Sequence, residues 1–138
     1  LQALAEQSDY GILQIDAHAD LRVAYENFTH SHASIFHNVL QHLPQVPQLT
    51  QVGLRDIAPA EYQYAQAMPQ RLRQFMMGDL RRAQFQGTLT YHDWCRQIVE
   101  TLPARVYISF DVDGLEPNLC PHTGPRGLGW ECRGATGV

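Results

Sequence analysis

The chain has 138 residues, of which 44% are hydrophobic, and a formal net charge of −4 at pH 7, which fits one small cytoplasmic domain with an apolar core. It has no apolar run of about 18 residues, which argues against a membrane span, and its first residues lack a basic region followed by an apolar run, which argues against a signal peptide. Arginines without a basic cluster argue against nucleic acid as a partner, and three cysteines without CxxC spacing argue against a disulfide framework or a zinc knuckle.

Hydrophobic periodicity predicts helices that alternate with strands. The predicted elements are, in chain order, a helix at residues 1–8, a strand at 11–16, a helix at 33–43, a strand at 49–54, a helix at about 59–68, a helix that Thr90 and Asp93 begin with a capping box, and a strand at 105–111. Residues 75–85 have an ambiguous pattern. The side chains expected to face inward from the second and fourth helices are Ile35, Phe36, Val39, Leu40, Leu43, Trp94, Ile98, Val99 and Leu102. Because parallel strands need helical crossovers, this order predicts an α/β fold with a parallel sheet that is covered on both faces.

Ligand-type side chains follow two of these predicted strands directly. Asp16, His18 and Asp20 come after the first strand at intervals of two residues, and Asp111 and Asp113 come after the last strand. Side chains two residues apart in extended backbone project from the same face. Both motifs therefore converge beyond the carboxyl ends of their strands, which is where open α/β sheets bind ligands.

Four carboxylates and one imidazole at one edge of a sheet favour a metal site. The carboxylates would repel each other unless a cation compensated their charge. Mostly hard oxygen ligands with one imidazole suit manganese better than zinc, and their number suggests two ions. Either motif alone is commonly a turn or a helix cap. Their joint position after the two clearest strands favours the metal interpretation.

His32 differs from the other histidines because of its place in the chain. It lies where the long loop after the first strand enters the next helix. Such a side chain could overhang the metals, and it could equally be a local cap of that helix. The sequence pattern alone leaves both interpretations open.

Three blocks of the sequence resemble the signatures of the arginase/agmatinase, or ureohydrolase, family. They are Asp16-Ala-His-Ala-Asp20, Ser31-His-Ala-Ser34 and Ser109-Phe-Asp-Val-Asp-Gly-Leu-Glu-Pro117. The resemblance implies a three-layer α/β/α fold with a central parallel sheet and two Mn²⁺ ions. It implies that Asp16 and Asp111 bridge the ions, that His18 and Asp113 hold one ion, and that Asp20 holds the other. It further implies that Asp20 orients the attacking hydroxide and that His32 helps to protonate the leaving amine.

The resemblance also implies an activity, a partial domain and partners. The activity is manganese-dependent hydrolysis of a small guanidino substrate to urea and an amine. Arg22 stands where arginases place an asparagine, so agmatine, which gives putrescine, is the leading substrate. Arginase or guanidinobutyrase activity, and an inactive metal-binding fragment, remain alternatives, because an upstream histidine ligand and a downstream glutamate of the family are absent. We expect residues 1–124 to form a partial ureohydrolase domain truncated at both ends, 125–138 to be an atypical, poorly ordered tail, and the intact protein to be a homo-oligomer.

Overall fold

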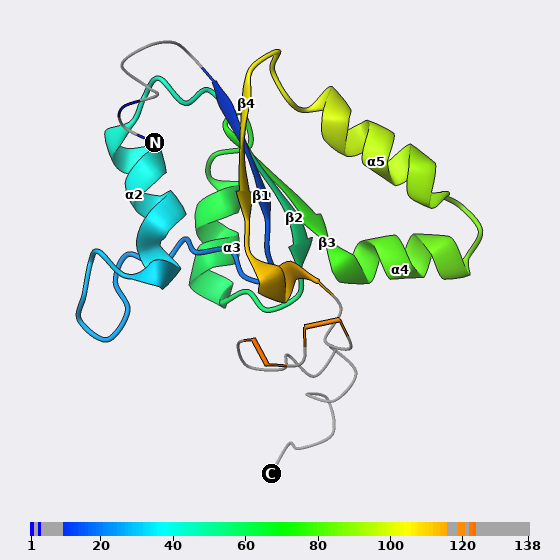
Figure 1. The fold of residues 1–138 in the computed structure, drawn as a ribbon, viewed down its shortest axis with the longest axis horizontal. Coiled ribbons are helices and arrows are strands. Elements are labelled where there is room, and N and C mark those ends of the chain that lie inside the picture. The colour runs from blue at the N-terminus through cyan, green and yellow to red at the C-terminus, as the bar shows by residue number, and fades with distance from the viewer. Residues whose placement is uncertain (2, 4–9, 116–118, 121, 124–138) are drawn as a thin grey trace.

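A computed structural model describes residues 1, 3, 10–115, 119–120 and 122–123, and within them a four-stranded parallel sheet forms the centre of the chain (Figure 1). The strands are β1 (Gly11–Ile15), β2 (Leu49–Leu54), β3 (Leu72–Met76) and β4 (Val106–Phe110). Their order across the sheet is β3-β2-β1-β4. The expected helix at 1–8 and the expected tail at 125–138 lie outside the described residues, apart from residues 1 and 3.

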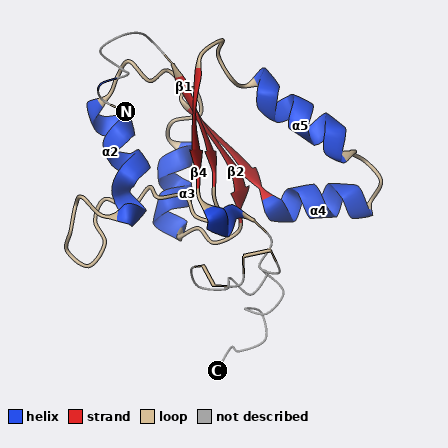
Figure 2. Cartoon of the chain, viewed as in Figure 1, coloured by secondary structure: helices blue, strands red, loops and turns tan. Residues whose placement is uncertain are grey.

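Helices cover both faces of the sheet, as Figure 2 shows. On one face lie α2 (Ile35–His42) and α3 (Pro59–Gln66), and on the other lie α4 (Met77–Phe85) and α5 (Tyr91–Glu100). Two short 3₁₀ turns, η1 (His32–Ser34) and η2 (Val112–Gly114), follow the loops after β1 and β4. The predicted three-layer α/β/α arrangement with a parallel sheet is confirmed. No helix among the described residues is long and apolar enough to cross a membrane.

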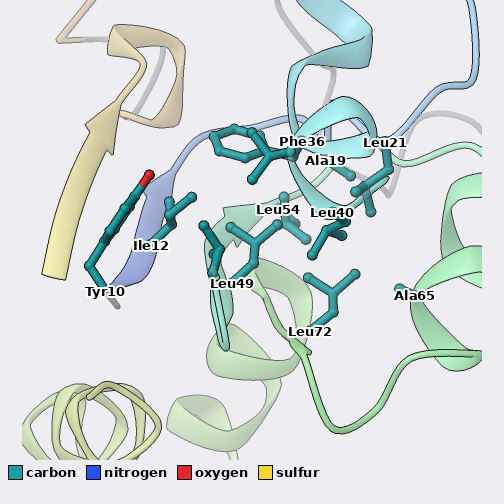
Figure 3. Packing of buried hydrophobic residues seen from close by; sticks show 12 residues of the cluster. Tyr10, Ile12, Ala19, Leu21, Phe36, Leu40, Leu49, Leu54, Ala65 and Leu72 are labelled. Atoms are coloured by element: carbon teal, nitrogen blue, oxygen red, sulfur yellow. The ribbon is translucent and has the colours of Figure 1, made fainter. Parts of the chain in front are cut away.

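The main core lies between the sheet and the α2/α3 layer. Ile12 and Leu49 point from the strands toward Phe36 and Leu40 of α2, and all four side chains are buried (Figure 3). A smaller core on the other face joins Leu80, Trp94 and Ile98 of α4 and α5. Burial of these apolar side chains is the main favourable contribution to folding, at about 25 cal/mol per Å² removed from water.

The strand order places a topological switch point between β1 and β4. The chain moves outward from β1 to β2 and β3, and it then returns to the opposite side of β1 to form β4. Ile15 is in register with Phe110, and the Asp111 N–H donates to the Ile15 carbonyl at 2.9 Å. The residues that follow these two strands therefore begin next to each other, at the edge where open α/β sheets bind ligands.

Two details of the predicted elements were wrong, and one element was missed. Ile35 and Val99, expected to face inward, are 43% and 64% exposed because each lies on the outer side of its helix. The ambiguous residues 75–85 divide between the end of β3 and the whole of α4. The strand β3 was not predicted because the exposed, charged Arg73 stands beside the half-buried Gln74 and the two together interrupt its apolar pattern.

The strand β4 lies at an edge of the sheet. Its apolar sequence is typical of strands that are covered on both faces. In the described structure, however, Ile108 is 60% exposed and Phe110 is 51% exposed. An exposed apolar edge strand favours aggregation of the isolated chain.

Candidate metal centre

Asp16, His18 and Asp113 come together at the switch point between β1 and β4. Each offers one oxygen or nitrogen atom, and these atoms all lie within 4.8 Å of one another. Asp16 is buried, whereas His18 and Asp113 are partly exposed. Two motifs from opposite ends of the described chain thus form one group with the composition of a metal site.

Backbone contacts fix the loop that carries Asp16 and His18. The Asp16 N–H donates to the Val52 carbonyl at 3.0 Å, which continues the pairing of β1 with β2. The N–H groups of Arg55 and Asp56 both donate to the Ala17 carbonyl, at 2.9 and 3.1 Å. The loop after β1 is therefore attached to the end of β2, which limits the positions that its side chains can take.

A glycine and a cap bring Asp113 close to this loop. The Asp111 carboxylate accepts a hydrogen bond from the Asp113 N–H at 3.0 Å and so begins the 3₁₀ turn η2. A Cβ atom at position 114 would lie only 3.0 Å from the Asp16 backbone nitrogen, so glycine at this position allows η2 to approach the loop after β1 closely. The Arg55 guanidinium donates to the carbonyls of Asp113 and Leu115, which holds the turn against the end of β2.

The three side chains contact each other directly. His18 Nδ1 lies 2.9 Å from Asp113 Oδ2 and 3.7 Å from Asp16 Oδ1. The backbone N–H of His18 donates to Asp16 Oδ1 at 2.7 Å, and the backbone N–H of Ala17 donates to Asp113 Oδ1 at 3.2 Å. The imidazole therefore lies between two carboxylates that the backbone itself orients.

These contacts shift the pKa values of the group. The hydrogen bond with the Asp16 carboxylate contributes most to the raised pKa of His18, whereas burial lowers this pKa. The negative charges of Asp113, Asp16 and Asp56 raise it further, to about 9. Burial alone would raise the pKa of Asp16, but hydrogen bonds from His18 and Gln14 outweigh it and lower this pKa. Burial raises the pKa of Asp113, and the neighbouring Asp16 and Asp111 charges add to this rise. The site concentrates negative charge and retains a proton on its imidazole.

The other predicted site residues lie around this group. Asp20 has a positive φ of 52°, and burial, followed by the charge of Asp16, raises its pKa to about 7. Asp111 is exposed and caps η2, and its charge influences both Asp20 and Asp113. His32 is exposed in η1, where its ring packs edge-on against Tyr25 with centroids 5.2 Å apart. None of these three belongs to the group of Asp16, His18 and Asp113.

The sequence interpretation missed two kinds of buried polar residue near the site. Glu61 of α3 is 5% exposed and accepts hydrogen bonds from the N–H groups of Leu21 and Ala58, at 2.9 and 3.0 Å. Gln14 and Gln51 are almost fully buried within β1 and β2. The available signal was the polar residue itself, because glutamine is unusual in strands that are covered on both faces.

The donor set fits a divalent cation. Mutual repulsion and burial raise the pKa values of Asp20 and Asp113, and His18 retains its proton to an unusually high pH. A cation among these groups would replace protons as the compensating charge. Carboxylate oxygens with one imidazole nitrogen are ligands that manganese accepts.

The raised pKa of His18 predicts how the stability of the metal-free chain depends on pH. A folded-state pKa of about 9, against an ordinary value of 6.5, gives a stabilising contribution that is complete below pH 6.5 and is lost as the pH rises through 9. We expect the free energy of unfolding, measured with urea in the presence of a chelator, to fall as the pH is raised from 6.5 to 9 and slightly beyond. The variant His18→Asn should show a smaller fall. An equal fall in this variant would contradict the prediction.

Comparison with known proteins assigns the chain to a family. Residues 1–136 match the family model described as the arginase family. The chain belongs to the arginase family. It is 33% identical over 126 residues to an N(1)-aminopropylagmatine ureohydrolase of Thermus thermophilus, a match that covers 88% of this chain and 38% of that protein.

Two solved structures of named enzymes resemble this arginase-family chain. Arginase from Medicago truncatula has a TM-score of 0.69 and 30% identity, with coverage of 92% of this chain and 39% of that one. The proclavaminate amidino hydrolase from Streptomyces clavuligerus also has a TM-score of 0.69, with 25% identity and coverage of 90% and 40%. The chain therefore spans about two-fifths of the length of the relatives that it matches. The suspected family and the predicted fold are both confirmed.

Proposed function

We propose that the chain carries part of a two-manganese centre that hydrolyses a guanidino compound to urea and an amine. The observation that carries this proposal is the group of Asp16, His18 and Asp113 at the switch point of the sheet, in a member of the arginase family. Two ions, when bound, would supply positive charge and an activated water molecule for attack on the guanidinium carbon. Asp16 and Asp111 would hold both ions, His18 and Asp113 one of them, and Asp20 the other.

Asp20 and His32 are the proposed catalytic side chains. The Asp20 carboxylate would orient the water molecule that the ions activate, because it follows β1 near Asp16 and Asp111, whose charges act on it. His32 would give a proton to the leaving amine from its exposed position in the loop before α2. Its contact with Tyr25, whose ring also lies 5.3 Å from the Arg22 guanidinium carbon, holds the imidazole on one side of this loop.

Agmatine is the proposed substrate. Arg22 stands at the position where arginases place an asparagine. Its Nε lies 3.9 Å from Glu61 Oε2, so the Arg22 guanidinium forms an ion pair within the protein. The Thermus relative is named for a derivative of agmatine, which supports an amine-bearing guanidino substrate. Arginine and guanidinobutyrate are the alternatives for comparison. The cytoplasmic location and the homo-oligomeric state of the intact protein stay predictions.

Urea release tests this function. The purified chain, with and without Mn²⁺, would be given agmatine, N(1)-aminopropylagmatine, arginine and guanidinobutyrate in parallel. We expect manganese-dependent turnover that is greatest with agmatine. Preference for another of these compounds would reassign the substrate. Bound manganese without turnover of any compound would favour the alternative that this chain binds metal but lacks a complete active site.

A further inference from the structure

Three glutamines form a continuous hydrogen-bonded ladder across the sheet. Gln14 of β1 is in register with Gln51 of β2, which is in register with Gln74 of β3. Gln74 Nε2 donates to Gln51 Oε1 at 2.8 Å, and Gln51 Nε2 donates to Gln14 Oε1 at 2.6 Å. Gln14 Nε2 in turn donates to Asp16 Oδ2 at 2.8 Å. The ladder therefore ends on a carboxylate of the candidate metal centre.

This ladder lies where apolar side chains would normally fill a parallel sheet. Gln14 is 1% exposed and Gln51 is fully buried. A buried amide costs free energy unless its donors and acceptors find partners. The Gln14 NH₂ group donates to Asp16 and, at 3.1 Å, to the His18 carbonyl. The Gln51 amide pairs with both neighbouring glutamines, and its NH₂ group also donates to the Ala19 carbonyl at 2.6 Å. Among the described residues, the side-chain hydrogen bonds of Gln14 and Gln51 outside the ladder thus go to the segment that carries Asp16, His18 and Asp20.

The direction of the ladder is set from its Asp16 end. The Asp16 carboxylate and the His18 carbonyl can only accept, so Gln14 must turn its NH₂ group toward them and its oxygen toward Gln51. Gln51 must then donate to Gln14, and also to the Ala19 carbonyl, which leaves its oxygen for the NH₂ group of Gln74. The three amide dipoles therefore point the same way, with their positive ends toward Asp16.

The far end of the ladder supports this direction. Gln74 Oε1 is buried and has no hydrogen-bond partner within the described part of the chain. An unpaired buried acceptor costs free energy, so its presence indicates that the orientation is imposed from elsewhere. The fixed acceptors around Asp16 impose it. Aligned hydrogen bonds also strengthen one another in a low-dielectric interior.

We infer that Gln14, Gln51 and Gln74 form a positioning ladder that holds the Asp16 carboxylate in one orientation for metal binding. This inference rests on the proposed metal centre. The ladder donates to Asp16 Oδ2 while the His18 N–H donates to Oδ1, so both oxygens are held before an ion arrives. Gln14 is a positioning residue, because it would act on the metal only through its contacts with Asp16 and with the His18 backbone.

Manganese affinity of substituted chains tests the ladder. Gln14→Met keeps the length of the side chain but removes its hydrogen bonds, and we expect it to weaken Mn²⁺ binding about 10-fold or more, as loss of partners of metal ligands does. Gln51→Met, which leaves the Gln14 contact with Asp16 in place, should weaken binding less. The matched control is Thr50→Val, which removes another buried hydrogen bond of β2, from Thr50 to Thr101 at 2.9 Å.

Isothermal titration with Mn²⁺ at mildly alkaline pH and thermal unfolding, both on the purified chain, separate positioning from stability. The inference requires that Gln14→Met weakens binding, and Gln51→Met weakens it less, while Thr50→Val binds as the unsubstituted chain does, although all three lower the melting temperature. Equal affinities in all variants, or equal losses in Thr50→Val and the glutamine variants, would overturn it. Failure of the unsubstituted chain to bind Mn²⁺ would instead contradict the metal centre, and the inference with it.

Discussion

The substitution Asp113→Asn should weaken the binding of Mn²⁺ by about 100-fold or more and leave the fold intact. Removing a hydrogen-bond partner of a metal ligand lowers metal affinity roughly 10–100-fold, and removing the charge of a ligand itself should lower it more. Asparagine can keep both contacts of this side chain. Its oxygen can accept from the Ala17 N–H, and its NH₂ group can donate to Nδ1 of a neutral His18. The change therefore removes charge from the site without removing hydrogen bonds.

Titration calorimetry at mildly alkaline pH, together with urea unfolding, checks this result. The matched control is Asp79→Asn, which removes a carboxylate that is 68% exposed on α4 and pairs with Arg82. It should leave manganese affinity unchanged. If Asp113→Asn bound Mn²⁺ as tightly as the control, Asp113 would not be a ligand.

The substitution Glu61→Leu should lower the free energy of unfolding by about 3 kcal/mol, since two N–H groups would each lose a partner at a cost of about 1–3 kcal/mol. These are the N–H groups of Leu21 and Ala58, which donate to the Glu61 carboxylate. Leu21 directly follows Asp20, whose left-handed backbone depends on the position of this loop. Loss of Glu61 should therefore also disturb the backbone that presents Asp20.

Urea unfolding monitored by circular dichroism measures this loss. Gln63→Ala, at an exposed position of the same helix, is the control and should change stability by less than about 0.5 kcal/mol. Comparable stability of Glu61→Leu and Gln63→Ala would show that the two N–H groups find other partners. In that event Glu61 would have no special part in holding the loop.

The parts of the fold that could be predicted from sequence are those with a strong local signal. The apolar runs of β1, β2 and β4 and the capping of α5 by Thr90, which accepts from the Asp93 N–H at 3.1 Å, follow from residues close together in the chain. The strand β3 has a weaker signal because the charged Arg73 stands directly before Gln74. Its pairing with Gln51 becomes apparent only when the register of the sheet is known.

The candidate site divides in the same way. Ligand spacing predicted that Asp16, His18 and Asp113 would lie at one edge of the sheet, and their side chains do lie together there, because the end of a strand fixes where the next side chains begin. Asp20 and His32 lie in a loop whose path depends on long-range contacts. Glu61 acts on that loop across 40 residues of sequence, through a hydrogen bond to Leu21. Sequence patterns carry no signal for such a contact.

Anomalous scattering from crystals of the chain soaked in Mn²⁺ tests the central claim most directly, because it locates the ion. We predict a manganese peak at coordination distance from the carboxylates of Asp16 and Asp113 and from Nδ1 of His18, with the imidazole no longer donating to a carboxylate. No peak beside Asp16, His18 and Asp113, or full-strength binding to crystals of Asp113→Asn, would contradict the assignment of this group as the metal centre.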